Sequence, residues 1–159
     1  MKVLMVSPEV APFVKEGGLA DVVGSLPPAL RRHDCDVRII CPLHGGIERG
    51  PSWKRLPGVL YVHLGEGVFY ASLWETRLPG AEVPVYFVEY DAFFARGEVY
   101  HGPWGAHGDN DRRFAFFCRA ALDACHFLEW SPDIVHAHDW TTGLVPVYLN
   151  TRDQVRREE

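Results

Sequence analysis

The stretch from Lys2 to Pro42 reads KVLMVSPEVAPFVKEGGLADVVGSLPPALRRHDCDVRIICP, and it predicts a strand, a helix and a second strand. Residues 2–6 form a short apolar run that a Ser-Pro pair ends, which is typical of a strand buried on both faces. Residues 36–41 form a second apolar run, rich in β-branched side chains and ended by a proline. This spacing is that of a βαβ unit, so we expect parallel strands joined by a right-handed crossover.

The segment between these two strands predicts an interrupted helix. Residues 19–23 begin a helical pattern, and Gly24 weakens it. Ser25 can cap a new turn, and Pro27 then falls close to the first helical position, where the missing N–H of proline has no cost. We therefore expect the helix to break near Gly24 and to start again at Ser25.

Strand and helix patterns continue to alternate along the rest of the chain. Two apolar runs, 59–64 and 69–73, flank Gly65-Glu66-Gly67 and predict a hairpin. The other expected elements are a strand at 83–90, a glycine-rich loop at 97–108, a helix with one apolar stripe at 109–128, a short strand at 134–136 and a helix at 141–149. The pattern predicts an α/β fold, a Rossmann-like and mostly parallel sheet with helices on both faces.

The composition excludes several classes of function. The net charge is -5, and Lys and Arg do not cluster, which argues against nucleic acid as a partner. The pair Arg112-Arg113 is expected on a solvated helix face. The four cysteines have neither a CxxC pair nor the spacing of zinc ligands, which indicates reduced thiols. No apolar run suits a signal peptide or a membrane span, so we expect a cytoplasmic protein with no membrane partner.

Residues 15–21, KEGGLAD, lie between the first expected strand and the helix, where open α/β sheets bind ligands. Gly17 and Gly18 allow backbone N–H groups to approach a phosphate at a helix start, and Lys15 adds a full positive charge. The segment matches neither GxGxxG nor GxxxxGK[ST]. The residues alone leave two interpretations open, a phosphate loop and an ordinary glycine turn beside a surface lysine.

Residues 136–140, HAHDW, close the last expected strand. Strand alternation puts His136 and His138 on one face and Asp139 in the loop. Two imidazoles and a carboxylate could bind zinc, but such a site needs further ligands and only twenty residues follow Asp139. We therefore assign no metal, and interpret His138 as a neutral imidazole that hydrogen-bonds a sugar hydroxyl, with Trp140 packed nearby. If His136 faces the core, its replacement is expected to act on stability.

Asp109-Asn110-Asp111 opens the longest expected helix. Capping of the helix explains Asp109 or Asn110, and the helix dipole explains the acid that follows. Carboxylates in glycine-rich loops also bind sugars, and the spacing does not choose between the two roles.

Taken together, these segments resemble the bacterial glycogen synthase and plant starch synthase family. The similarity covers residues 1–149 and keeps the family's order of motifs. The motifs are MKVL and SPEVAPF within 1–13, KEGGLADV at 15–22, PVYFV at 84–88, Asp109-Asn110 followed by Arg113-Phe114, and PDIVHAHDW at 132–140.

The resemblance implies one of the two Rossmann-like domains of a GT-B glycosyltransferase. The family transfers glucose from ADP-glucose or UDP-glucose to the non-reducing end of an α-1,4-glucan, with retention of configuration and with no cofactor that we assign. Carried over by position, Lys15 and Gly18 contact the donor diphosphate beside Gly17, Asp21 lies next to the donor site, Asp109 is a sugar-contacting acid and His138 holds the transferred glucose. Donors at the diphosphate stabilise the charge that develops on the leaving group.

The chain departs from the family pattern at Glu16, where Thr is common, and at residues 43–46, LHGG. We assign residues 1–150 to an incomplete N-terminal Rossmann-like domain and residues 151–159 to a charged tail. The resemblance places the catalytic Glu in a second, C-terminal domain, so no catalytic residue is assigned here. We expect the chain alone to be inactive, with that domain as a partner.

Two other functions stay open at this point. The first is a non-catalytic module that binds glucan or assembles with a separately encoded second half. The second is a metal-dependent hydrolase built on His136 and His138.

Overall fold

The computed structural model describes the backbone of residues 1–157 and the side chains of residues 1–151. Its strands are β1 (Lys2–Val6), β2 (Asp36–Pro42), β3 (Lys54–Arg55), β4 (Leu60–Leu64), β5 (Gly67–Arg77), β6 (Pro84–Glu89), β7 (His101–Gly102), β8 (Gly105–Ala106) and β9 (Ile134–Ala137). Its helices are α1 (Gly18–Arg31), α2 (Asp91–Phe94), α3 (Asn110–Phe127) and α4 (Val145–Arg157), with a 3₁₀ turn η1 (Trp140–Thr142).

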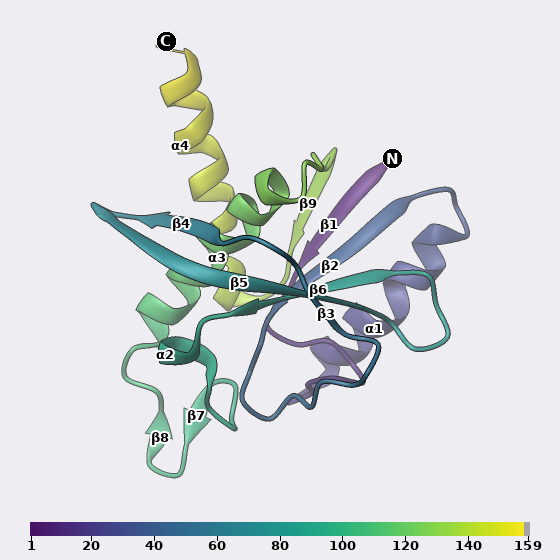
Figure 1. Ribbon diagram of the computed structural model, residues 1–159, viewed down its shortest axis with the longest axis horizontal. Helices are drawn as coiled ribbons and strands as arrows, with labels where there is room; N and C mark the ends of the chain where they lie inside the picture. The colour runs from purple at the N-terminus through teal and green to yellow at the C-terminus, as the bar shows by residue number, and fades with distance from the viewer. Residues whose placement is uncertain (158–159) are drawn as a thin grey trace.

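One sheet organises the molecule, in the order β3-β5-β6-β2-β1-β9, with β4 paired to β5. The pairs β6–β2, β2–β1 and β1–β9 are parallel, whereas β5 is antiparallel to β6 and to β4 (Figure 1). The predicted α/β fold, with its βαβ unit and mostly parallel sheet, is therefore confirmed. The predicted hairpin is also confirmed, because Leu64 pairs with Gly67 across a two-residue turn.

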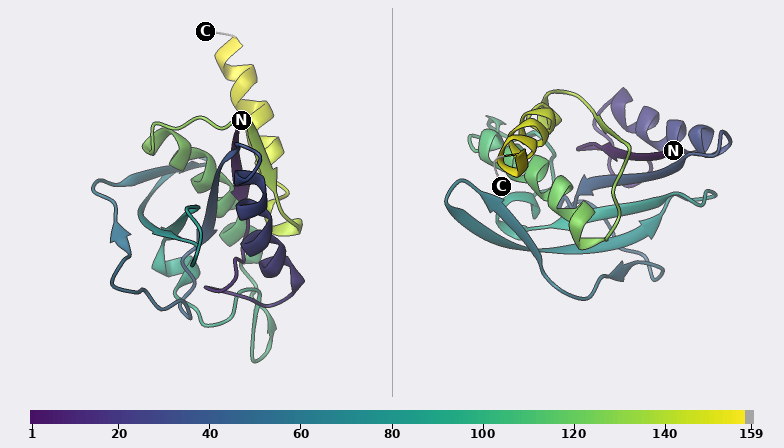
Figure 2. Two further views of the ribbon diagram at one scale, coloured as in Figure 1. Left: turned by 90° about the vertical axis from the view of Figure 1, so that its right-hand side faces the viewer. Right: turned by 90° about the horizontal axis from the view of Figure 1, so that it is seen from above.

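The two faces of the sheet carry separate apolar cores. Val3 and Met5 of β1 belong to the core beneath α1, whereas Leu4 and Val6 belong to the core beneath α3. Figure 2 shows α1 apart from the pair α3 and α4. Alternate residues of a strand point to opposite faces, so the continuous apolar run of β1 is what a strand buried on both faces needs.

The prediction of a broken α1 is wrong, because one helix runs from Gly18 to Arg31 with Pro27 and Pro28 inside it. Val23 is buried in the core beneath α1, and Leu26 and Leu30 pack against that core. Burial of this apolar stripe stabilises the helix more than proline and glycine disfavour it. Ser25 caps no new turn, since its hydroxyl donates to the Asp21 carbonyl one turn earlier.

The other local differences from the expected elements lie at element ends and in the loops. The loop at 97–108 contains the two-residue strands β7 and β8. The helix expected at 141–149 is divided into η1 and α4. Because α4 continues across residue 150, the domain border predicted there coincides with no element end, and it stays a prediction.

Gly24→Ala should destabilise the fold, although alanine is the better helix former. A Cβ atom at position 24 would lie 2.8 Å from the carbonyl oxygen of Ala11. We expect the free energy of unfolding to fall by about 1–3 kcal/mol, instead of rising by the ~1 kcal/mol that helix propensity alone gives. Gly18→Ala is the matched control, since nothing lies within 4 Å of that position. Urea denaturation of both variants decides the sign, and a stabilised Gly24→Ala protein would contradict this packing.

Candidate functional site

The carboxyl ends of the four parallel strands β6, β2, β1 and β9 lie at one edge of the sheet. Backbone hydrogen bonds continue past these ends, from Ser7 N to the Ile40 carbonyl and from His138 N to the Val6 carbonyl, at 3.1 Å each. Figure 1 shows β1 running from the N-terminus toward the side of the molecule that holds α2 and the β7–β8 hairpin. In open α/β sheets ligands bind at this edge, so the loops that begin here form the candidate site.

The glycine turn leads from the β1 loop into α1. Gly17 is the N-cap residue, Gly18 opens the helix, and a Cβ atom at either position would meet nothing within 4 Å. The Gly17 N–H donates to Glu9 at 3.0 Å, and the neighbouring Glu16 N–H donates to the same oxygen at 2.7 Å. The N–H groups of Gly18 and Leu19 have no acceptor among the described residues. An anion at this helix start would therefore meet Gly18 and Leu19, and not Gly17.

Lys15 and Asp21 flank this turn and bind each other. The Lys15 ammonium lies 2.6 Å from one Asp21 carboxylate oxygen and 2.7 Å from the other, and both side chains are more than half exposed. Exposed ion pairs of this kind contribute little to stability, about 0–1 kcal/mol. Lys15 can therefore exchange Asp21 for another anion at small cost.

His136 and His138 share one face of β9, as predicted, and their ring centroids lie 4.1 Å apart. His138 is buried, and its Nε2 atom has no hydrogen-bond partner in the described structure. Burial, with a smaller contribution from His136, lowers the pKa of His138 to about 4, so its ring is neutral at pH 7. His136 is exposed, so the condition under which its replacement would act on stability is not met. Strand alternation predicts that the two rings share a face, but it does not predict how exposed each ring is.

The loop after β9 holds Trp140 against two other aromatic rings. Asp139 has a positive φ of 64°, and its side chain accepts the Trp140 N–H at 2.7 Å. Trp140 is 58% exposed, and its ring lies 5.3 Å from Phe114 and 6.0 Å from Tyr100. An exposed aromatic ring therefore follows His138 by two residues along the chain, and the Nε2 atom of His138 has no partner in the described structure.

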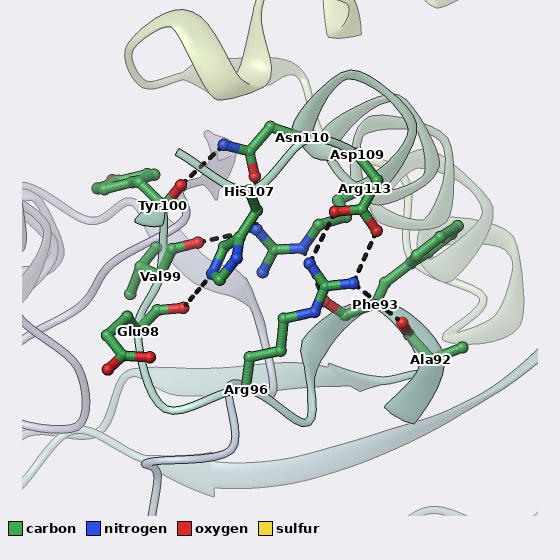
Figure 3. Close-up of polar contacts among 10 residues, drawn as sticks. All are labelled: Ala92, Phe93, Arg96, Glu98, Val99, Tyr100, His107, Asp109, Asn110 and Arg113. Atoms are coloured by element: carbon green, nitrogen blue, oxygen red, sulfur yellow. Dashed lines mark hydrogen bonds and ion pairs between the residues drawn. The ribbon is translucent and has the colours of Figure 1, made fainter. Parts of the chain in front are cut away.

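Asp109 lies at the N-cap position of α3, but its side chain does not cap the helix. Both carboxylate oxygens accept hydrogen bonds from Arg96, at 2.7 Å each, and these bonds lower the pKa of Asp109. Figure 3 shows the Arg96 guanidinium facing Asp109 beside the guanidinium of Arg113. The capping explanation of Asp109 is therefore wrong, because this carboxylate binds a side chain thirteen residues earlier.

Arg113, expected on a solvated face, is fully buried. It donates to the carbonyls of Phe93 at 2.7 Å and Val99 at 3.0 Å, and to the side chain of Asn110 at 2.7 Å. Burial, and then the charge of Arg96, lowers its pKa to about 10, so it remains a cation at pH 7. Arg113 thus fastens the segment between α2 and β7 to the start of α3.

Residues 43–46, LHGG, also hold the segment that follows α2 in place. His44 is buried, with Nε2 3.0 Å from the Pro8 carbonyl, and burial lowers its pKa to about 4. The Gly45 N–H donates to the carbonyls of Phe94 and Arg96, at 2.8 Å each. A Cβ atom at position 45 would lie 2.8 Å from the Arg96 backbone nitrogen, so this contact requires glycine.

Elsewhere in the described structure we assign no second ligand site. A groove of about 700 Å³ runs along residues 75–82 with Ser52 and Lys54. It lies at the amino end of β6, away from the loops that the carboxyl edge brings together, and we do not assign a ligand to it. The described residues contain no group of three or more His, Cys, Asp or Glu side chains that could hold a metal ion. Within the same part of the chain no helix is long and apolar enough to cross a membrane.

The family model of the starch synthase catalytic domain matches residues 2–158. The chain belongs to this family. Glycogen synthase 1 of Geobacter sulfurreducens is 46% identical over 153 residues, and glycogen synthase of Thermotoga maritima is 43% identical over 156 residues. Each match covers 95% of this chain, but only 30% of the first relative and 31% of the second.

A solved structure shares the fold. The catalytic domain of starch synthase IV from Arabidopsis thaliana, bound to ADP and acarbose, matches with a TM-score of 0.83 and 33% sequence identity. The match covers 94% of this starch synthase-family chain and 30% of that one. The resemblance inferred from the sequence motifs is thereby confirmed for the part of the family's length that this chain spans.

The buried neutral imidazoles predict a loss of stability in mild acid. An unfolded histidine binds a proton near pH 6.5, whereas buried His44 has a pKa of about 4. Between these values the unfolded chain binds more protons, so stability falls as the pH falls. We expect His44 to contribute about 2 kcal/mol to the loss between roughly pH 7.5 and pH 5.

Urea unfolding of two variants at both pH values checks this contribution. His44→Gln keeps a donor for the Pro8 carbonyl and removes the titrating ring, so the pH dependence should flatten. His101→Gln, at an exposed histidine, is the control for the substitution itself. An equally steep loss in the parent and in His44→Gln would contradict the assignment.

Proposed function

We propose that this chain forms the part of a glycogen or starch synthase that binds the diphosphate and the glucose of a nucleotide sugar during transfer to the non-reducing end of an α-1,4-glucan. Membership of the family and the names of the relatives support this. The observation that carries the proposal is the free Nε2 atom of buried His138, at the same sheet edge as the open glycine turn.

In this proposal the glycine turn binds the diphosphate. The Gly18 N–H, at the positive end of α1, donates to a phosphate oxygen across the open space in front of Gly17. Lys15 turns from Asp21 to the diphosphate, and Asp21 remains beside the donor. The negative charge that grows on the leaving nucleoside diphosphate then meets donors that are already in place, which lowers the barrier to transfer.

His138 would bind the transferred glucose. A buried nitrogen without a partner costs free energy, about 1–3 kcal/mol, and a sugar hydroxyl would satisfy it. The neutral ring suits a hydroxyl, because one nitrogen donates and the other accepts. Each Asp109 oxygen has a second lone-pair direction beyond its bond to Arg96, so we keep Asp109 as a sugar contact, shared with that arginine.

We favour ADP-glucose over UDP-glucose as the donor, because the starch synthase IV structure that this chain matches is bound to ADP. Its bound acarbose supports a glucan acceptor in the same way. The four cysteines are free thiols, which supports the proposed cytoplasmic location. Because the chain spans about 30% of the length of its relatives, we propose that the catalytic Glu belongs to the family's second domain.

Lys15→Ala should weaken use of the donor without changing glucan affinity. A chimaera tests this, in which the chain replaces the matching segment of Geobacter sulfurreducens glycogen synthase 1. Loss of one charge-assisted hydrogen bond should lower kcat/KM for ADP-glucose by about 2 kcal/mol, roughly 30-fold. The KM for glycogen serves as the internal control. Unchanged donor kinetics in an active chimaera would remove Lys15 from the site.

His138→Ala should impair glucosyl transfer more than folding in the same chimaera. His136→Ala is the matched control, since that ring lies beside His138 but is exposed. We expect roughly tenfold or greater loss of kcat/KM for His138→Ala, from the lost sugar contact, and little change for His136→Ala. Thermal melts confirm that both variants fold. Loss of activity in His136→Ala beside a fully active His138→Ala would reverse the assignment.

A further inference from the structure

Glu9 is a buried acid to which the sequence motifs assign no role. Its side chain lies in the loop between β1 and α1, and the residue is 3% exposed. None of the ion pairs of the described residues includes it. A buried carboxylate without a cation costs free energy unless hydrogen-bond donors surround it. The donors that face Glu9 therefore indicate its structural role.

Three donors face Glu9, and two of them belong to the glycine turn. One carboxylate oxygen, Oε2, accepts the consecutive N–H groups of Glu16 at 2.7 Å and Gly17 at 3.0 Å. The other, Oε1, accepts the Tyr100 hydroxyl at 2.5 Å. Two successive N–H groups held by one oxygen fix the backbone before Gly18, whose own N–H group has no acceptor among the described residues. Glu9 therefore acts as an internal anion that shapes the turn.

Tyr100 connects this turn to the rest of the edge. Its carbonyl accepts the Asn110 side-chain amide at 2.8 Å, and Asn110 in turn accepts from Arg113. Its ring packs 6.0 Å from Trp140, in the loop that follows His138. Burial and the bond to Glu9 raise the pKa of Tyr100, so the hydroxyl stays protonated and keeps donating.

We propose that Glu9 is a positioning residue, which holds the glycine turn in the shape that receives a diphosphate and couples it through Tyr100 to the His138 loop. The proposal rests on the proposed function for the identity of the anion. Glu9 does not touch the donor in this account, since its oxygens are already bound to the Glu16 and Gly17 amides and to Tyr100.

The sign of the effect on ADP binding separates positioning from simple electrostatics. Removing a negative charge near a diphosphate should strengthen binding if charge alone matters. Glu9→Gln should instead weaken it, because a neutral amide oxygen holds the two turn N–H groups less strongly than a carboxylate oxygen does. Glu16→Gln is the matched control, since it removes a charge from the same loop but leaves both bonds from the turn to Glu9 in place.

The experiment measures two quantities on the 159-residue chain, hydrogen exchange of the Glu16 and Gly17 amides by NMR and the dissociation constant of ADP. For Glu9→Gln we expect exchange of both amides to accelerate about tenfold or more and ADP to bind about tenfold more weakly. For Glu16→Gln the Gly17 amide should stay protected and ADP affinity should hold or rise. Tyr100→Phe keeps the ring and should preserve amide protection, while its ADP affinity falls less than in Glu9→Gln.

Unchanged amide exchange in Glu9→Gln overturns the proposal, because the carboxylate then does not hold the turn. Faster exchange with equal or tighter ADP binding overturns it as well, because the turn's shape then does not serve the diphosphate. A parent chain that binds no ADP is a different result, which contradicts the proposed function and removes the basis of this inference with it.

Discussion

The parallel pairing of β1 on both of its edges is the constraint on which the structure depends. β1 hydrogen-bonds to β2 on one side and to β9 on the other, and residues 3–6 are almost fully buried. Parallel neighbours need long crossovers, so each strand of this group is followed by a loop at the same edge. The segments after β1, β2, β6 and β9, far apart in the chain, meet there for that reason.

Polar contacts, more than apolar packing, fix the shape of these loops. Glu9 binds two backbone N–H groups of the glycine turn, and Arg113 binds two backbone carbonyls of the segment between α2 and β7. Both side chains are buried and charged, and each is stabilised largely by backbone dipoles. Buried backbone groups must be hydrogen-bonded, and no strand or helix supplies partners for these groups in the loops. Glu9 and Arg113 supply those partners instead. The geometry of the site therefore depends on a small number of hydrogen bonds.

The sequence predicted best those features that depend on neighbours in the chain. The strand runs at 2–6 and 36–41, the hairpin and the long third helix follow from local periodicity, and so does the shared face of His136 and His138. The break at Gly24 was wrong because burial of α1 on the sheet, a tertiary effect, outweighs local propensity. Side-chain partners distant in sequence, such as Glu9 with Tyr100, gave no signal. The burial of Arg113 was predictable, because this residue lies four positions before Phe117 on the apolar stripe of its helix.

In the proposed function, the edge where β1 and β9 end binds the diphosphate of a sugar nucleotide at the start of α1. A crystal structure of the chain soaked with ADP would locate the bound diphosphate. We expect diphosphate oxygens within hydrogen-bond distance of the Gly18 and Leu19 amides, with Lys15 turned from Asp21 toward them. ADP bound instead along the groove of residues 75–82, with the glycine turn and the Lys15–Asp21 pair unchanged, would show that the diphosphate site lies elsewhere.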